Sequence, residues 1–197
     1  MSIRLGAGVP FGKATDQPGD GQTARYSSQF ATEIALGAKL SAPIYLGGYA
    51  GLWTGAEGDD VYTGGLCNGG SLHDVDCNTE STRLGLEIQY HFIPDGLVNP
   101  WLGYGLAYEW AQENIDDHIG QRTERSSVEG MQYGRFQGGI DFRFGKVFGL
   151  GLYLQSEIGR YTRATTEING QETHSGGIDR TAIHGWFGSG VRMVFFP

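Results

Sequence analysis

Apolar and polar residues alternate along most of this chain, with the period of two that is typical of β-strands and not the 3.6-residue period of helices. The clearest segment is 81–93, where one face is apolar and the other is polar and charged. Its apolar face is formed by Leu84, Leu86, Ile88, Tyr90 and Phe92, and its polar face by Arg83, Gly85, Glu87, Gln89 and His91. The segment is therefore predicted to form a two-faced strand.

Seven further segments repeat this design. They are 3–11, 28–40, 44–55, 101–113, 130–144, 147–162 and 182–196. In segment 44–55 an aliphatic set and an aromatic set compete for the apolar face, and we favour the aliphatic set. The two sets are Ile44, Leu46 and Leu52, and Tyr45, Tyr49 and Trp53. Eight strands is an even number, as antiparallel closure with both termini on one side requires.

The connections between these segments are alternately long and short. The short ones are 41–43, 94–99 and Gly145-Lys146, and the long ones are 12–24, 57–80, 114–129 and 163–181. Because every connection reverses the strand direction, all long loops should lie at one end of the molecule and all tight turns at the other. Outer-membrane barrels have this asymmetry, with long external loops and short periplasmic turns. We predict an all-β fold with a single domain over 1–197, an eight-stranded antiparallel up-and-down transmembrane β-barrel.

The charges on the polar faces indicate which face points inward. Six basic and five acidic residues lie there, and this near balance suggests mutual pairing, which enclosed charges need because burying an unpaired charge is costly. An eight-stranded barrel is just wide enough for side chains to fill, and inward glycines would leave room for long arginines. The predicted lumen charge network is Arg4, Glu33, Lys39, Arg83, Glu87, Glu109, Arg135, Asp141, Arg143, Glu157 and Arg192.

Aromatic residues gather at both ends of the apolar faces, with aliphatic residues between them. Beside the short turns these are Tyr90, Phe92, Phe142, Phe144, Phe148 and Phe195, and beside the long loops Phe11, Phe30, Tyr108 and Trp110. Two aromatic girdles around an aliphatic band of about 25 Å are typical of a barrel that crosses a bilayer. A soluble lipocalin-like barrel that binds an apolar ligand is the alternative.

The composition of the chain agrees with a membrane barrel. Apolar residues make up 39% of the 197 residues and glycine supplies 34 of them, so a large water-soluble core is hard to build. The net charge of −8 provides no basic stripe, and nucleic acid is excluded as a partner. Since Met1 is followed almost at once by alternating residues, we expect the sequence to be the mature form.

Two cysteines, Cys67 and Cys77, lie in one loop with nine residues between them. At an oxidising surface we expect a disulfide, while two free thiols in a cytosolic protein are the alternative. In the same loop, 74–80 has oxygen ligands at alternate positions but lacks the later glycine and glutamate of a calcium loop. We therefore assign no metal site and no cofactor.

Three segments resemble the small outer-membrane barrels of the OmpA, OmpX and OmpW type. They are Asn99-Pro-Trp-Leu-Gly-Tyr-Gly-Leu-Ala-Tyr108, Phe136-Gln-Gly-Gly-Ile-Asp-Phe142 and Gly188-Ser-Gly-Val-Arg-Met-Val-Phe-Phe196. The resemblance spans the whole chain as a pattern of glycine and alternation, and it implies an integral protein of the bacterial outer membrane with its loops facing the cell exterior. In that family the last strand ends on an aromatic residue, whereas here Phe196-Pro197 extends beyond the expected end.

Three functions fit such a barrel. The first is a structural and surface-interaction protein with a filled lumen, acting in adhesion or envelope integrity; the second is a narrow channel for ions or small solutes. The third, a lipid A-modifying enzyme, would need a nucleophile and a base near the outer rim. No spacing of His91, His184 and Ser156 singles out a catalytic triad, so we expect no enzyme.

The predicted partners follow from the barrel and its loops. Membrane lipid and lipopolysaccharide would surround the barrel, and we expect a monomer. The four long loops hold 15 of the 22 acidic residues, so they could gather divalent cations that bridge lipopolysaccharide.

Overall fold

The computed structural model describes residues 1–14, 21–58, 75–145, 147–178 and 183–195. Within these ranges the chain forms nine strands and one short helix. They are β1 (Ser2–Gly12), α1 (Gln22–Arg25), β2 (Tyr26–Lys39), β3 (Ile44–Glu57), β4 (Val75–His91), β5 (Val98–Asp117), β6 (Arg122–Phe144), β7 (Phe148–Ile168), β8 (Gln171–Gly177) and β9 (Ile183–Phe195).

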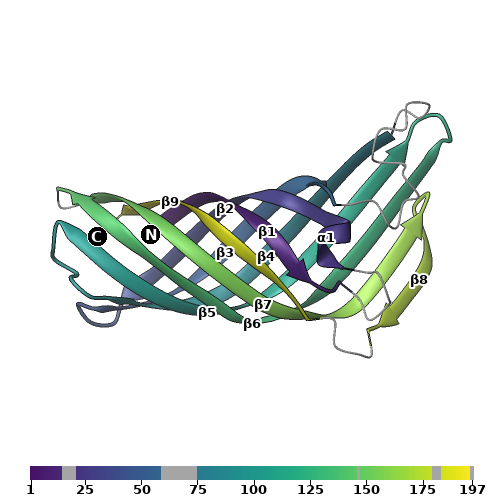
Figure 1. Ribbon diagram of the computed structural model, residues 1–197. Helices are drawn as coiled ribbons and strands as arrows, with labels where there is room; N and C mark the ends of the chain where they lie inside the picture. Colours follow the sequence, from purple (N-terminus) through teal and green to yellow (C-terminus); the bar gives the residue numbers. More distant parts are fainter. Residues whose placement is uncertain (15–20, 59–74, 146, 179–182, 196–197) are drawn as a thin grey trace.

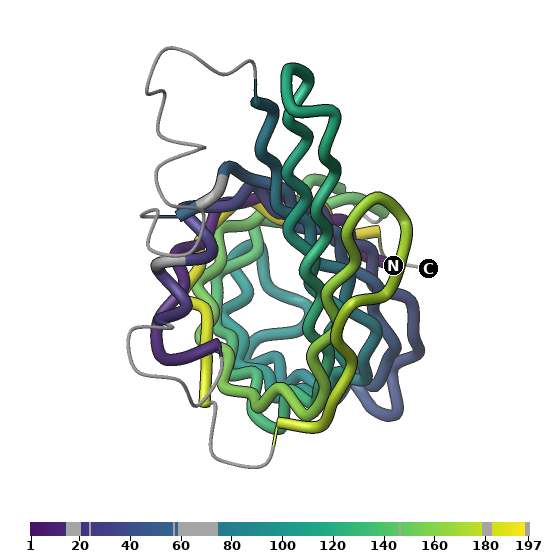
Figure 2. Tube along the Cα trace, turned by 90° about the vertical axis from the view of Figure 1, so that its right-hand side faces the viewer, coloured from purple at the N-terminus to yellow at the C-terminus, as the bar shows by residue number. Residues whose placement is uncertain are grey.

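Eight of these strands close into a ring. Each strand from β1 to β7 pairs antiparallel with the next, and β9 pairs with both β7 and β1. The view along the axis shows the closed barrel (Figure 2). Strand β8 lies outside the ring and pairs with the far end of β7 (Figure 1). The predicted eight-stranded antiparallel barrel is confirmed.

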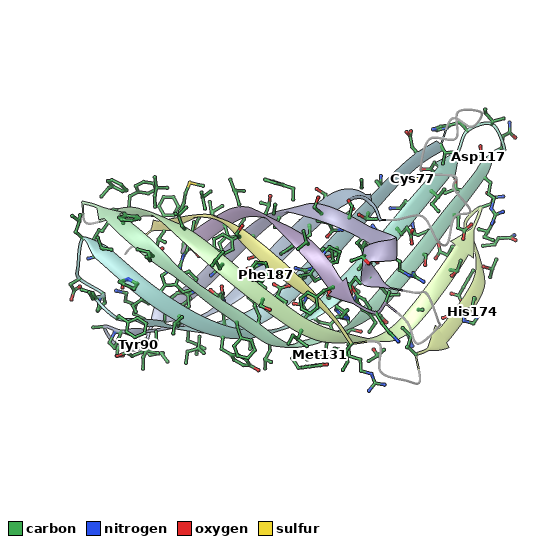
Figure 3. The ribbon with its side chains drawn as sticks, viewed as in Figure 1. Cys77, Tyr90, Asp117, Met131, His174 and Phe187 are labelled. Carbon is green, nitrogen blue, oxygen red and sulfur yellow. The ribbon has the colours of Figure 1, made fainter. Side chains whose placement is uncertain are left out.

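The alternation in sequence becomes two faces of the barrel wall. Leu84 and Leu86 of β4 are 59% and 67% exposed on the outside, while Arg83 and Glu87 on either side of them are buried inside. On β3 the aliphatic residues face outward and the aromatic residue Trp53 is fully buried. The outward side chains surround the barrel along its length (Figure 3). The hydrocarbon surface therefore lies outside, opposite to the arrangement in a soluble barrel.

The predicted boundaries of the long connection 114–129 are wrong. Strand β5 continues to Asp117 and β6 begins at Arg122, so the two form a hairpin that projects beyond the barrel (Figure 1). Strands β4 and β7 are extended at the same end, and β8 occupies part of the predicted loop 163–181. These segments are mostly polar, with only isolated apolar residues such as Ile115 and Val128, so alternation could not reveal them.

The opposite end carries the tight turns and both termini (Figure 1). Gly145 in the turn between β6 and β7 has φ +75°, a conformation that glycine adopts without steric cost. The backbone N–H of Phe195 donates to the Met1 carbonyl at 2.8 Å, so the first and last strands are joined at this end. Among the described helices none is long and apolar enough to span a membrane.

Candidate functional site: the charged lumen

The polar faces of seven strands place a set of charged side chains inside the barrel. All of them are at most 3% exposed. They are Arg4 of β1, Glu33 of β2, Arg83 and Glu87 of β4, Glu109 of β5, Arg135 and Asp141 of β6, Glu157 of β7 and Arg192 of β9. The sequence predicted each of these nine as a member of the lumen network.

Arg83 joins two carboxylates at the outer part of the lumen. Its Nη2 lies 2.9 Å from Glu109 Oε1 and its Nη1 lies 2.7 Å from Glu157 Oε2. Gln132 donates from Nε2 to both carboxylates, at 2.9 Å to Glu109 Oε2 and 3.2 Å to Glu157 Oε2. Each buried charge in this group thus has partners of opposite charge, and the carboxylates also have a neutral donor, the condition under which buried ions are tolerated.

The next layer is centred on Arg135. Its guanidinium forms ion pairs with Glu33 and, from Nε at 3.4 Å, with Glu157 Oε1. Its Nη2 also donates to Gln155 Oε1 at 2.7 Å. Because β2 and β6 lie four strands apart in a ring of eight, the pair of Arg135 and Glu33 spans the full width of the lumen.

Arg4 extends the network toward the short-turn end. Its Nη2 lies 2.7 Å from Glu87 Oε1, and its Nη1 lies 3.6 Å from Glu33 Oε2. Gln137 donates to the other Glu87 oxygen at 2.9 Å. Below it, Arg192 Nη1 lies 3.8 Å from Asp141 Oδ2. The ion pairs therefore continue from the outer part of the lumen almost to its short-turn end.

Aromatic rings cover the faces of three of these guanidinium groups. The Arg83 Cζ lies 3.9 Å from the Trp53 ring centroid, and the Arg135 Cζ lies 4.1 Å from that of Tyr49. The third is Arg192, which lies against Trp101. Stacking of this kind attracts the cation electrostatically. The lumen is therefore occupied by side chains through successive layers of ion pairs and rings.

Glycines on the inner face provide the space for these large groups. A Cβ atom added at Gly139 would lie 3.0 Å from the Trp101 ring, and one at Gly159 would lie 3.0 Å from the His184 ring. At Gly8 it would overlap Trp53. These contacts match the expectation that inward glycines make room for bulky lumen residues.

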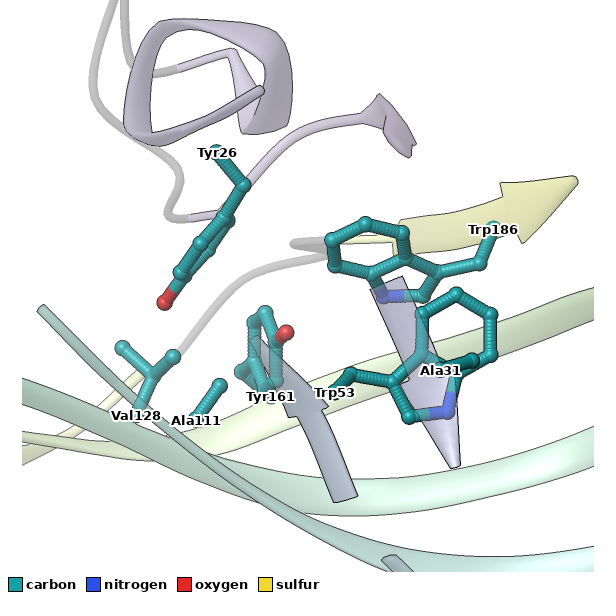
Figure 4. Packing of buried hydrophobic residues seen from close by; sticks show 7 residues of the cluster. All are labelled: Tyr26, Ala31, Trp53, Ala111, Val128, Tyr161 and Trp186. Atoms are coloured by element: carbon teal, nitrogen blue, oxygen red, sulfur yellow. The ribbon is translucent and has the colours of Figure 1, made fainter. Parts of the chain in front are cut away.

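An apolar cluster lies at the outer end of the lumen (Figure 4). It consists of Tyr26, Ala31, Trp53, Ala111, Val128, Tyr161 and Trp186. The rings of Trp53 and Trp186 lie 5.4 Å apart at their centroids, and the Trp186 ring lies 5.9 Å from that of Tyr26. We call these seven residues the outer cluster. Sequence reasoning missed it as a group, because alternation gives the face of a residue and not its neighbours across the lumen.

His184 lies beside this cluster, fully buried. Its ring stacks on Tyr161 with centroids 3.7 Å apart, and its Nε2 lies 3.0 Å from Glu109 Oε2. Ser156 is on the outward face of β7, opposite Phe187 in register. Ser156 and the buried His184 therefore do not form a pair of nucleophile and base. The sequence also missed the ion pair of Arg25 and Glu113 further out, whose Nη1 and Oε2 lie 4.0 Å apart.

Two predicted network residues lie elsewhere. Lys39 is exposed at the end of β2, and Arg143 is partly exposed, with its Nη1 3.9 Å from Asp95 Oδ1 of the neighbouring turn. Both lie where the strands end and the lumen opens to solvent, so alternation gave their face correctly but not their depth. The prediction that they join the enclosed network is wrong.

The predicted girdle residues lie on the outer wall. At the short-turn end Tyr90 packs edge-on against Phe92 with centroids 5.2 Å apart, and Phe148 lies 5.7 Å from Phe195 and 6.3 Å from Phe144. Phe142 is exposed on the same wall, and at the long-loop end Phe11, Phe30 and Trp110 are exposed, with Tyr108 4.7 Å from Trp110.

The remaining predicted features concern the long-loop end. Cys77 lies on β4, but Cys67 is outside the described residues, so the disulfide stays a prediction. Among the residues described, no group of three or more His, Cys, Asp or Glu side chains could hold a metal ion.

A closed antiparallel ring of eight strands with an outward hydrocarbon band, aromatic rims and enclosed ion pairs defines a small outer-membrane β-barrel protein. Solved structures agree at the level of the fold. Neisserial surface protein A has a TM-score of 0.52 and 13% identity, with 99% of this chain and 96% of that chain covered. A major outer membrane protein from Thermus thermophilus has the same score and identity, with 99% of each chain covered. Comparison of the sequence with protein families and with curated proteins gives no match.

Proposed function

We propose that this barrel has a filled lumen and acts as a structural and surface-interaction protein of the outer membrane, in adhesion or envelope integrity. The observation that carries the proposal is the ion pair of Arg135 and Glu33, which spans the lumen between opposite walls. A hydrated ion would have to break this pair and leave charges unpaired in a medium of low dielectric, which is costly.

The outer cluster supports the same proposal. Trp53, Tyr161 and Trp186 are each 0% exposed and lie above the ion pairs, on the long-loop side. Large apolar rings at this position oppose the passage of water and ions, since a hydrophobic constriction loses its water. The lumen thus has a charged barrier and an apolar barrier in series.

The projecting strands supply the surface for interaction. The ends of β4 to β7, together with β8, extend the barrel wall as a sheet beyond the outer rim (Figure 1). This sheet carries Asp76, Asp116, Asp117, Glu124, Glu129, Glu167 and Glu172. We propose that lipopolysaccharide surrounds the barrel and that divalent cations join its phosphates to these carboxylates. We further propose that the protein is a monomer and has no catalytic activity.

Conductance in a planar lipid bilayer tests the filled lumen. We expect the purified full-length protein to give no steady single-channel current. A variant with Trp53→Ala and Trp186→Ala is the matched comparison, because it removes two large rings of the apolar barrier and keeps every charged residue of the network. A steady open state of the unmodified protein would contradict the proposal and favour the narrow channel.

The surface role needs a separate test. In one variant a two-residue turn connects Gln112 to Ser127 and replaces the residues between them. The barrel should still form, and its band should still shift on an unboiled gel, because the strand pairings of the eight-stranded ring are retained. We expect cells carrying it to lose attachment or to become sensitive to detergent. Unchanged attachment and unchanged detergent resistance would refute a surface role of this hairpin. Altered lipid A mass spectra after expression of the native chain would instead support an enzyme.

A further inference from the structure

A cavity of about 420 Å³ lies at the short-turn end of the lumen, below the ion-pair network. It is the end at which the chain termini lie (Figure 1). Its polar lining includes Lys39, Tyr45, His91 and Arg192, and its apolar lining includes Ala38, Val194 and Phe195. The cavity is separated from the outer cluster by the whole network of buried charges.

Arg192 is a deeply buried polar residue of this cavity, at 3% exposure. Its Nη2 donates to Gln89 Oε1 at 2.9 Å, and its Cζ lies 4.3 Å from the Trp101 ring centroid. Its Nε and Nη1 have no hydrogen-bond partner in the part of the chain that the structure describes. Asp141, at 3.8 Å from Nη1, is an ion-pair partner beyond hydrogen-bonding distance. Two buried N–H groups of a cation thus lack the acceptors that buried donors normally have.

Tyr45 adds a second buried donor to the same cavity. Its hydroxyl has no hydrogen-bond partner among the described residues. Lys39 brings another positive charge to the cavity wall. Acidic groups at this end include Asp141, which faces Arg192, and Asp95, which faces Arg143. The described residues that line the cavity therefore include cationic side chains and a phenol, and no carboxylate.

We propose that this cavity binds a small organic anion, with a phosphate or carboxylate group held by Arg192, Lys39 and Tyr45. Charge-assisted hydrogen bonds from guanidinium and ammonium groups are the interactions that recognise such oxyanions. The buried side chain of Val194 would contact a short apolar body attached to the anionic group. Since this end carries the short turns, the ligand would come from the periplasmic side.

Three probes separate the contributions of the anionic group and the apolar body. The full-length protein in micelles is titrated with inorganic phosphate, phenyl phosphate and benzoate, and the Arg192 Nε–H signal is followed by nuclear magnetic resonance. We expect phenyl phosphate to shift this signal and to bind more tightly than inorganic phosphate. Benzoate tests the carboxylate, and its tighter binding would identify that group as the preferred one.

Variants at the cavity wall test the named residues. Lys39→Gln should weaken phenyl phosphate binding about tenfold, the effect of losing one hydrogen bond from a charged group, and Tyr45→Phe should weaken it measurably. Lys13→Gln, which removes an exposed lysine at the opposite end of the barrel, is the matched control and should change nothing. Equal weakening by Lys13→Gln, or no shift of the Arg192 signal with any probe, would overturn the proposal. Neither result bears on the conductance test of the filled lumen.

Discussion

An arginine in place of Leu86 provides the most direct test of which face of the wall meets lipid. Leu86 is 67% exposed on the outer wall and lies opposite Leu106 of the neighbouring strand. If hydrocarbon surrounds this wall, Leu86→Arg puts a charge into lipid. If water surrounds it, the same change costs almost nothing.

The depth of Leu86 follows from strand geometry. A strand rises about 3.3 Å per residue and is tilted by about 40° in such barrels, so each residue of β4 crosses roughly 2.5 Å of the membrane. The outward residues from Thr82 to Phe92 then traverse about 25 Å, the height of the apolar band, with Leu86 roughly 10 Å from one edge. An arginine near the bilayer midplane costs about 2–4 kcal/mol, and one near the interface about 0–1 kcal/mol.

Reversible unfolding by urea in lipid vesicles, followed by tryptophan fluorescence, measures this difference. We expect Leu86→Arg to lower the free energy of unfolding by about 2–4 kcal/mol and the matched variant Thr82→Arg, on the same strand and face, by less than about 1 kcal/mol. If the two variants are equally stable, or if Leu86→Arg is neutral, the assignment of the outer face to lipid fails.

Three further changes test the lumen and its mouth by the same unfolding measurement. Arg83→Met should cost about 3–5 kcal/mol, because it leaves Glu109 and Glu157 buried without their shared cation; a cost below about 1 kcal/mol would mean that this ion pair is not enclosed. Trp53→Ala should also cost about 3–5 kcal/mol through lost packing and the cavity it leaves, and a neutral result would remove the outer cluster as a packed unit. Lys39→Gln should leave the free energy of unfolding unchanged within about 0.5 kcal/mol, since substitutions of exposed side chains usually change stability little. A larger loss of stability would mean that Lys39 belongs to the enclosed network.

Alternation in the sequence was sufficient to predict the barrel and the direction of its side chains. In β4, Arg83 and Leu84 face opposite sides of the wall as their positions require. On β3 the aliphatic set faces outward, as the sequence analysis favoured over the aromatic set. Trp53 has the volume to fill the lumen, while Leu52 faces outward. These successes share one cause: strand periodicity determines the face of each residue before any contact is known.

Alternation carries no information on depth or partners. Lys39 and Glu33 share one face of β2, yet one lies at the mouth and the other pairs across the full lumen. The pairing of Arg135 with Glu33 depends on the stagger of strands around the ring, which the sequence does not encode locally. The extended hairpin was missed because its residues are mostly polar, with Ile115 and Val128 as isolated buried apolar residues, so no apolar face alternates along it.

The continuity of β5 and β6 from the turn end to the projecting tip has a mechanical consequence. Asp117 lies seven residues beyond Trp110, so the tip stands roughly 20 Å past the rim on strands that also form the wall. A force that pulls on the tip acts on the hydrogen bonds between β5 and β6 along their whole length. The force is transmitted directly to the part of these strands that lies in lipid. An attached partner would thus be held by the barrel itself, with no flexible joint in between.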